Sequence, residues 1–222
     1  MLLLPKLDPD ERSNAHLQRL VQKLHPSDRS QFLDKLTTQT LRERFHSYRE
    51  LLLGAQIRCG GADFRYEQNI DGQTPDWSLT EDGILIEFID VVTLHQRNEK
   101  EREITMSICA TSNWQGWSTI PSDHIYRKLT DKAGQYSALA RRVQAPYVLA
   151  VFGEFLASIS VEEIEHVLYK QHEVGWFATV PEVSGVIYFR ENFFRYEFTY
   201  FPNFRANKSA IWCNRINRWS ET

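Results

Sequence analysis

The chain has 222 residues, of which 42% are hydrophobic and 25% are charged, and its formal net charge at pH 7 is −3. This length is enough for one well-packed domain or for a domain with an appendage, and the composition is that of an ordinary globular protein. A dedicated nucleic-acid-binding protein usually has an excess of basic residues. The overall charge therefore gives no support for that class, although a local basic groove can lie on an acidic protein.

Signals for secretion or membrane insertion are absent from the sequence. The three cysteines, Cys59, Cys109 and Cys213, are far apart and form no CxxC pair, which indicates reduced thiols in a cytoplasmic protein. The apolar run in MLLLPKLDPDER is too short for a signal peptide. No run of about 18 apolar residues occurs, so we expect no membrane-spanning helix.

Helical patterns cover the N-terminal part of the chain. Residues 9–24 are polar and we interpret them as a surface helix or an arm, so that residues 1–27 form a helical N-terminal extension. A second helical pattern runs from 28 to 57 and ends at Cys59-Gly60-Gly61. Glu50 lies near its end and projects from a mostly apolar stripe, because Leu53, Gly54 and Ile57 follow at helical spacing. The alternative for Glu50 is a helix rim with the carboxylate in water.

The segment 73–93, QTPDWSLTEDGILIEFIDVVT, is the one around which the rest is organised. It follows a strand predicted over 62–70 and a turn at Asp71-Gly72. Asp82-Gly83 suits a tight primed turn, so the segment is predicted to be a β-hairpin. Its second strand is apolar on both faces, as in a central strand covered by two layers. We expect one face to carry Ile84, Ile86, Phe88 and Val92, and the other to carry Leu85, Ile89 and Val91.

One acid interrupts that apolar strand. Glu87 falls in the second of the two sets, and a buried carboxylate costs several kcal/mol unless it is paired, protonated or bound to a metal. Asp76 lies on the neighbouring strand, directly after a proline. Two carboxylates that meet across a hairpin can bind a divalent cation. Asp90 is expected on the strand face opposite to Glu87 and therefore outside such a site.

The rest of the chain alternates helices and strands. A charged and then apolar stretch after Thr93 suggests a loop that leads into a helix, or a lid. A helix is predicted over 121–143, where Lys132 and Gln135 share one stripe, and a buried strand over 147–153, which together indicate a βαβ unit. A short capped helix over 160–169 and a terminal hairpin over 184–201 follow. We therefore expect one α/β domain over 28–222, with its core at about 47–153 and the C-terminal helix and hairpin in 154–222.

At this point the chain resembles the PD-(D/E)XK nuclease-like superfamily. The resemblance is carried by RELLLGAQIRCGG, TPDW, ILIEFIDV, DKAGQY and PYVLAVFG, and it covers roughly residues 47–153. It implies a restriction-endonuclease-like fold, in which a central mixed sheet is flanked by helices. It also implies hydrolysis of phosphodiester bonds in DNA or RNA, with Mg²⁺ or Mn²⁺ as the cofactor.

The resemblance also implies a set of site residues. Asp76 and Glu87 would hold the metal ion, Glu50 would be a third acid, and Lys132 and Gln135 would face the site from the following helix. The motif places a lysine two residues after its second acid, and here that residue is Ile89. Either Lys132 replaces this lysine, or hydrolysis has been lost and the protein binds nucleic acid or protein only. A homodimer or a larger assembly is compatible with both.

Other site classes lack their motifs. No HExxH, GxxxxGK[ST], GxGxxG or GxSxG sequence occurs, which argues against a zinc hydrolase, a nucleotide triphosphatase, a dinucleotide enzyme and a serine hydrolase. The C-terminal third is aromatic and basic. Such a composition is typical of single-strand nucleic-acid contacts, but a strand pair that buries its aromatic residues is the simpler interpretation.

Overall fold

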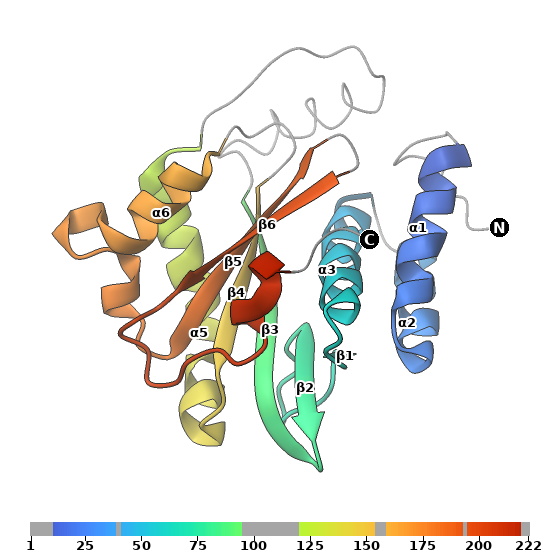
Figure 1. Ribbon diagram of the computed structural model, residues 1–222, viewed down its shortest axis with the longest axis horizontal. Helices are drawn as coiled ribbons and strands as arrows, with labels where there is room; N and C mark the ends of the chain where they lie inside the picture. The colour runs from blue at the N-terminus through green and yellow to red at the C-terminus, as the bar shows by residue number, and fades with distance from the viewer. Residues whose placement is uncertain (1–10, 39–40, 95–119, 154–158, 193–194, 219–222) are drawn as a thin grey trace.

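The computed structural model describes residues 11–38, 41–94, 120–153, 159–192 and 195–218 (Figure 1). The described residues form one mixed sheet of six strands in the order β1-β2-β3-β4-β5-β6. The strands are β1 (Arg65–Tyr66), β2 (Trp77–Glu81), β3 (Ile84–Leu94), β4 (Tyr147–Gly153), β5 (Val183–Asn192) and β6 (Arg195–Pro202).

The strand connections are those that the sequence predicts. Strands β2 and β3 are antiparallel and turn at Asp82 and Gly83, whose φ values of 49° and 78° are those of a primed turn. Strand β3 is parallel to β4, and helix α5 (Ser122–Val143) crosses between them. Strands β4 and β5 are also parallel, and β5 and β6 form the terminal hairpin. The predicted βαβ unit and both predicted hairpins are confirmed.

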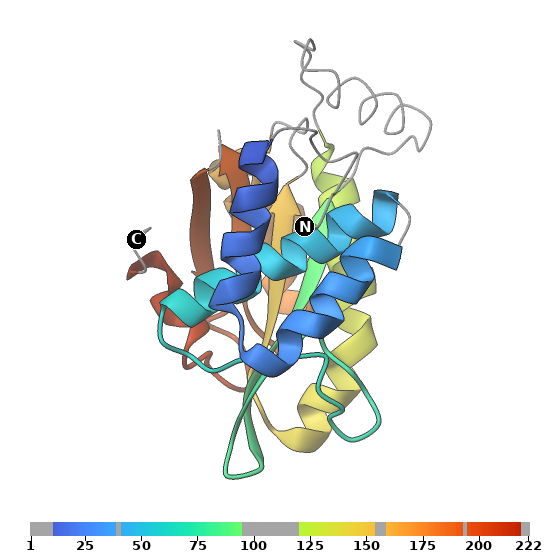
Figure 2. The same cartoon turned by 90° about the vertical axis from the view of Figure 1, so that its right-hand side faces the viewer.

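Two helical layers cover the sheet. Helices α1 (Glu11–Lys23), α2 (Pro26–Thr38) and α3 (Leu41–Cys59) lie on one face, and α5 and α6 (Val161–Tyr169) lie on the other (Figure 1). Helix α3 lies against the sheet, and α1 and α2 pack on its outer side (Figure 2). The described residues also form three short 3-10 helices. After α6 come η1 (Gln171–Glu173) and η2 (Trp176–Thr179), and after β6 comes η3 (Cys213–Arg218). None of the described helices combines the length and the apolar character that a membrane crossing requires.

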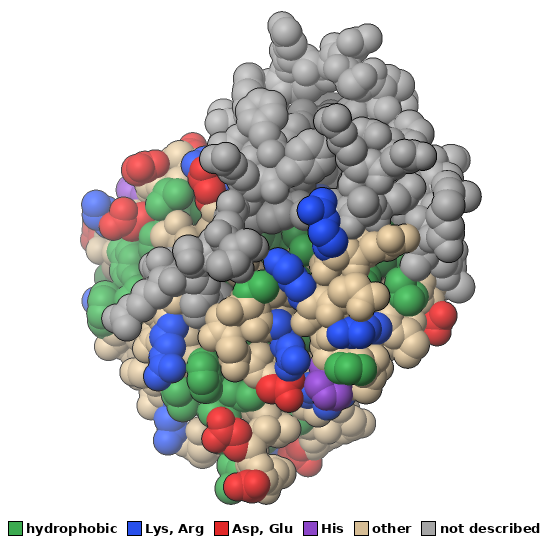
Figure 3. Space-filling view, turned by 45° about the vertical axis from the view of Figure 1, so that its right-hand side comes forward, with side chains coloured by type: hydrophobic (Ala, Val, Ile, Leu, Met, Phe, Trp, Pro, Cys, Tyr) green, Lys and Arg blue, Asp and Glu red, His purple; other side chains and the backbone are tan. Residues whose placement is uncertain are grey.

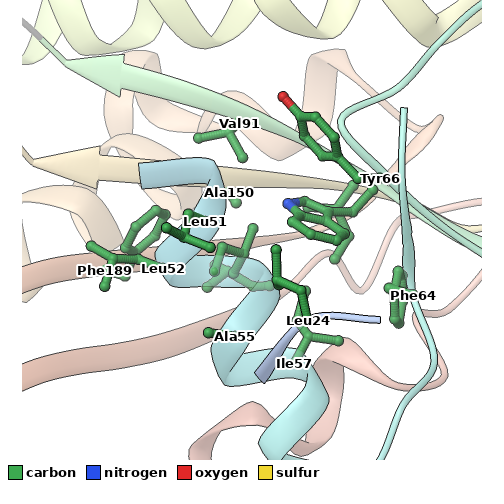
Figure 4. Close-up of a cluster of buried hydrophobic side chains, with 14 of the residues drawn as sticks. Leu24, Leu51, Leu52, Ala55, Ile57, Phe64, Tyr66, Val91, Ala150 and Phe189 are labelled. Carbon is green, nitrogen blue, oxygen red and sulfur yellow. The ribbon is translucent and has the colours of Figure 1, made fainter. Parts of the chain in front are cut away.

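Helix α1 is not a free arm. Its apolar side chains are buried in the same cluster as those of α3, and they are Leu17, Leu20 and Val21, with Leu24 directly after the helix. Figure 4 shows Leu24 among Leu51, Leu52 and Ile57 of α3. The helix predicted over 28–57 is divided into α2 and α3, and residues 39–40 between them lie outside the described part.

The strand predicted over 62–70 is much shorter in the structure. Only Arg65 and Tyr66 pair with β2, because Glu67 has a left-handed φ of 44° and turns the chain away. The bridge between Ile70 and Gln73 then closes the predicted turn at Asp71-Gly72. The loop or lid predicted after Thr93 falls outside the described residues.

Strand β3 contains an irregularity that changes its faces. Leu79 is opposite Glu87, but Thr80 is opposite Leu85, so Ile86 is an extra residue on β3. Consequently Ile86 packs on the α3 side and Leu85 on the α5 side, the reverse of the predicted assignment. From Phe88 onwards the alternation follows the prediction.

Candidate functional site

Asp76 lies at the start of β2, where the ladder between β2 and β3 ends. The last paired residue is Trp77, opposite Ile89, so Asp76 stands opposite Asp90. The Asp76 carboxylate accepts a hydrogen bond from the backbone N–H of Val91, with an Oδ2–N distance of 2.6 Å. The carboxylate thus takes an acceptor position on β3 just before the first residue of β2. This places its charge at the edge of the β2–β3 ladder, close to acids on both faces of the sheet.

Asp90 is fully buried on the α5 face of β3. The ammonium group of Lys132 on α5 lies 3.0 Å from Asp90 Oδ2, and the two side chains are 21% and 1% exposed. The direction of this approach is not that of a hydrogen bond, and Oδ2 has no hydrogen-bond partner. Lys132 thus faces the sheet, as the sequence predicts, but its partner is Asp90 and not Glu87.

Glu50 approaches from the opposite face, on α3. It is 3% exposed and is therefore buried, not placed at a helix rim. The hydroxyl group of Tyr66 donates a hydrogen bond to Glu50 Oε2. The Nε2 atom of His46, one helical turn earlier, lies 3.2 Å from Oε1. The carbonyl oxygen of Glu50 accepts from the indole N–H of Trp77 at 3.1 Å, which ties this turn of α3 to β2.

These acids affect one another's pKa values. Burial, and then the charge of Asp76, raises the pKa of Glu50 to about 8. Burial, and then Asp76, also raises the pKa of Asp90 well above its usual range, and the Lys132 ammonium opposes this shift. Asp76 therefore lies close to acids on both sides of the sheet. At neutral pH Glu50 therefore holds a proton, which a bound cation would displace.

Glu87 does not join these acids, and the expectation that it meets Asp76 is corrected by the structure. Its carboxylate points to the other face from Asp90 and accepts three backbone N–H groups, from Ile211 at 2.7 Å, Trp212 at 2.8 Å and Cys213 at 3.0 Å. These hydrogen bonds satisfy the buried charge without a metal ion. Burial, and then the charge of Glu87, raises the pKa of the Cys213 thiol, which makes this cysteine a poor nucleophile.

The loop that carries Asp76 is tied to α5 at three points. Arg142 binds both the carboxylate and the carbonyl group of Asp71. The Gln73 amide donates to the Gln135 carbonyl oxygen at 3.5 Å. The Tyr136 hydroxyl donates to the carbonyl oxygen of Thr74 at 2.9 Å. The side chain of Gln135 is exposed, so this residue contributes through its backbone and not through the amide that the sequence suggested.

Two residues at this site carried no role in the sequence-based prediction. Lys35 on α2 donates a hydrogen bond to the Tyr66 hydroxyl at 2.7 Å and forms an ion pair with Glu67. With Glu50, Glu67, Asp76 and Asp90 there are four acids, and Lys35 and Lys132 supply two cations, so the fully ionised group carries a net charge of −2. We call these six residues the acid cluster. The raised pKa values of Glu50 and Asp90 make its net charge at neutral pH less negative than this.

The acid cluster is not a complete metal site as it stands. Among the described residues, no three His, Cys, Asp or Glu side chains converge closely enough to hold an ion. Two carboxylates are sufficient for Mg²⁺, because this ion usually keeps several water ligands and takes others from substrate phosphates. The buried Asp90 Oδ2, which lacks a hydrogen bond, is a suitable hard oxygen ligand.

Charge is distributed unevenly over the surface. Figure 3 shows Lys and Arg side chains gathered across the middle of the face that lies between the views of Figures 1 and 2, with acidic side chains near its margins. The chain as a whole has a net charge of −3. A phosphate backbone would therefore be attracted by local groups of cations and not by the molecule as a whole.

Comparisons of this chain with protein-family models, with curated proteins and with solved structures gave no match. The geometry of the acid cluster is thus the basis for a functional assignment.

Proposed function

We propose that this protein is a metal-dependent phosphodiesterase with a restriction-endonuclease-like core, and that it cleaves DNA or RNA. Asp76 and Asp90 would hold Mg²⁺ or Mn²⁺, Glu50 would be the third acid, and Lys132 would supply the ammonium group. The observation that carries this proposal is the meeting of Asp76, Asp90 and Lys132 at the end of the β2–β3 hairpin.

The order of elements supports this assignment. A helix with Glu50 is followed by three antiparallel strands, a helix with Lys132 and a strand parallel to the third, and this is the order that the resemblance implies. The motif acid on β3 changes from Glu87 to Asp90. Two residues after Asp90 the same strand face carries Val92, so the strand lacks the motif lysine in this register as well, and Lys132 reaches the acid from α5 instead.

The residues of the site have separate tasks in this proposal. A bound divalent cation would polarise the phosphate and lower the pKa of a bound water molecule. Asp76, directly before β2, stands opposite Asp90 on β3, so their carboxyl groups are held near each other by the hairpin. The Lys132 ammonium would neutralise charge that develops on the phosphate oxygens. Glu50, whose pKa is about 8, would hold a proton at neutral pH next to Asp76.

Cleavage of supercoiled plasmid and of single-stranded DNA and RNA, with Mg²⁺ or Mn²⁺, tests the proposal. We expect Asp76→Asn and Asp90→Asn each to abolish cleavage and Lys132→Met to reduce it at least 100-fold, by the loss of one charge-stabilising group. Glu87→Gln, compared at equal folded fraction, and the exposed Glu81→Gln are expected to retain it. Cleavage that survives Asp90→Asn but not Glu87→Gln would show that the acid was assigned to the wrong residue.

A catalytically degenerate nuclease fold that binds nucleic acid or protein is the second candidate. It is favoured by the lack of a three-ligand metal site among the described residues and by the ion pair that occupies Asp90. Calorimetry with Mn²⁺ separates the two candidates. Binding of one ion per chain that is lost in Asp76→Asn supports the enzyme. No heat at millimolar Mn²⁺, together with no cleavage, supports the binding protein.

A further inference from the structure

We propose that Lys35 is a positioning residue of this site, which holds the carboxyl group of Glu50 in place through the hydroxyl group of Tyr66. The inference deepens the proposed function and rests on it for the role of Glu50. It makes helix α2, to which the sequence assigned no function, a part of the site. Three successive contacts lead from α2 to α3 and support this role of Lys35.

The first contact fixes the ammonium group of Lys35. Lys35 forms an ion pair with Glu67, and Gln31, one turn earlier on α2, donates to the other carboxylate oxygen of Glu67 at 2.6 Å. The Lys35 ammonium also lies 4.7 Å from the centre of the Tyr66 ring. With a side chain that is 25% exposed, Lys35 is held in one position and does not sample the solvent freely.

The second contact sets the direction of the chain of hydrogen bonds. The Tyr66 hydroxyl accepts from Lys35 at 2.7 Å, and an ammonium group can only donate. The hydroxyl has one hydrogen, which it therefore directs to Glu50. Burial raises the pKa of Tyr66, so the hydroxyl stays neutral and remains a donor.

The third contact is rigid because the Tyr66 ring packs against two other aromatic rings, which also stack on each other. Its centre lies 4.0 Å from that of Phe32 and 5.1 Å from that of Trp77. Figure 4 shows Tyr66 at the edge of the apolar cluster, with its hydroxyl oxygen directed away from the other labelled side chains. Because the Glu50 carbonyl group is also held by Trp77, both ends of Glu50 are fixed, and its carboxyl group stays next to Asp76.

Two single variants and their combination test this inference, and each single variant removes one group with little change in shape. Lys35→Met keeps the aliphatic stem, Tyr66→Phe keeps the ring, and the double variant removes both contacts. Lys23→Met on α1 is the control, because Lys23 is an exposed lysine outside the acid cluster. Circular dichroism and thermal unfolding establish that each variant is folded.

Affinity for Mn²⁺ alone, measured by calorimetry, gives the first result. We expect each single variant to lose about tenfold in affinity, because Glu50 is the third acid of the site and its carboxyl group would no longer be held next to Asp76. Because the two residues act in series, the double variant is expected to be no weaker than the weaker single variant. Unchanged affinity in Lys35→Met, or a double variant whose loss is the product of the two single losses, would overturn the proposal.

A measurement that needs no metal separates this proposal from the proposed function. In protein labelled with ¹³C at glutamate carboxyl groups, the Glu50 signal is identified by its loss in Glu50→Gln. We expect Lys35→Met to shift this signal more in the native background than in the Tyr66→Phe background, where only the direct charge effect of Lys35 on Glu50 remains. Lys35→Met could shift the Glu50 signal as expected while the native protein neither binds Mn²⁺ nor cleaves nucleic acid. In that case the positioning role of Lys35 stands and the nuclease proposal fails. If the signal does not move, the positioning role fails whatever the activity.

Discussion

Glu50 is a carboxyl group in a place where its charge is costly. It is 3% exposed, lies near Asp76 and has a pKa of about 8 in the folded protein, against 4.5 as the usual value. Between these two pH values the unfolded chain releases the Glu50 proton and the folded chain keeps it. Stability therefore falls as the pH rises through this window, by up to about 1.4 kcal/mol per pH unit for one proton.

We expect Glu50→Gln to remove this part of the pH dependence. Relative to the variant, the native protein should lose stability between about pH 4.5 and about pH 8, and the difference should level off above pH 8. Urea unfolding of both proteins at pH 5, 6.5 and 8 measures this difference in the free energy of unfolding. Parallel stability curves for the two proteins would mean that Glu50 is ionised in the folded state across the window.

Glu87 has a structural role that can be measured separately. Its carboxylate is the acceptor for three consecutive backbone N–H groups, and Glu87→Ala would leave one donor in a buried position and two in partly buried positions without this acceptor. We expect a loss of about 3 kcal/mol or more in the free energy of unfolding. The exposed Glu81→Ala should change it by less than about 0.5 kcal/mol. Equal effects in chemical denaturation would contradict the role of Glu87 as the anchor of residues 211–213.

At the scale of elements, a glycine on α3 allows this helix to approach the sheet closely. A Cβ atom on Gly54 would lie 2.1 Å from the Trp77 ring, which is fully buried and stacked on Phe32. Gly54→Ala should therefore destabilise the protein by about 2 kcal/mol or more, although alanine favours helix by about 1 kcal/mol. Gly134→Ala on α5 has open space around it and should stabilise the protein by about 0.5–1 kcal/mol. Thermal unfolding of both variants tests the contrast, and destabilisation of similar size in each would contradict it.

The elements themselves could be predicted largely from sequence, because each carries a local signal. The Asp82-Gly83 turn, the continuous apolar run of β4 and the stripe of α5 depend only on neighbouring residues. The Ser160 capping box is also local, and both of its hydrogen bonds are present. The extra residue at Ile86 is not local, because it depends on how β3 packs between two helical layers.

The wrong assignment of Glu87 as the partner of Asp76 has a different cause. The sequence indicated Glu87 as the second metal ligand because this acid interrupts an apolar run. The hairpin register, counted from the turn, already places Asp76 nearer to Asp90 than to Glu87, and with the bulge Asp76 stands directly opposite Asp90. The role of Glu87 could not be predicted, because its three donors lie more than 120 residues away in the sequence. Lys35 was missed for the same reason, since α2 reaches the site only through tertiary packing.

For the molecule as a whole, the N-terminal helices are part of the fold. Leu17, Leu20, Val21 and Leu24 are buried against α3. At about 1.5–3 kcal/mol for each buried side chain, their loss would equal much of the total stability of a typical domain. A chain that begins at residue 28 should therefore lack a cooperative unfolding transition in calorimetry. A sharp transition near the unfolding temperature of the full chain would instead support a domain boundary after residue 27.

The three ties between α5 and residues 71–74 have a consequence for how any ligand is received. A loop anchored at Asp71, Gln73 and Thr74 to one helix moves with that helix, so the spacing between Asp76 and Lys132 is established when the chain folds. The entropy of ordering this loop is then lost during folding and not during binding. A site that is formed during folding binds ligands that already match its shape. This loop therefore has little capacity for induced fit.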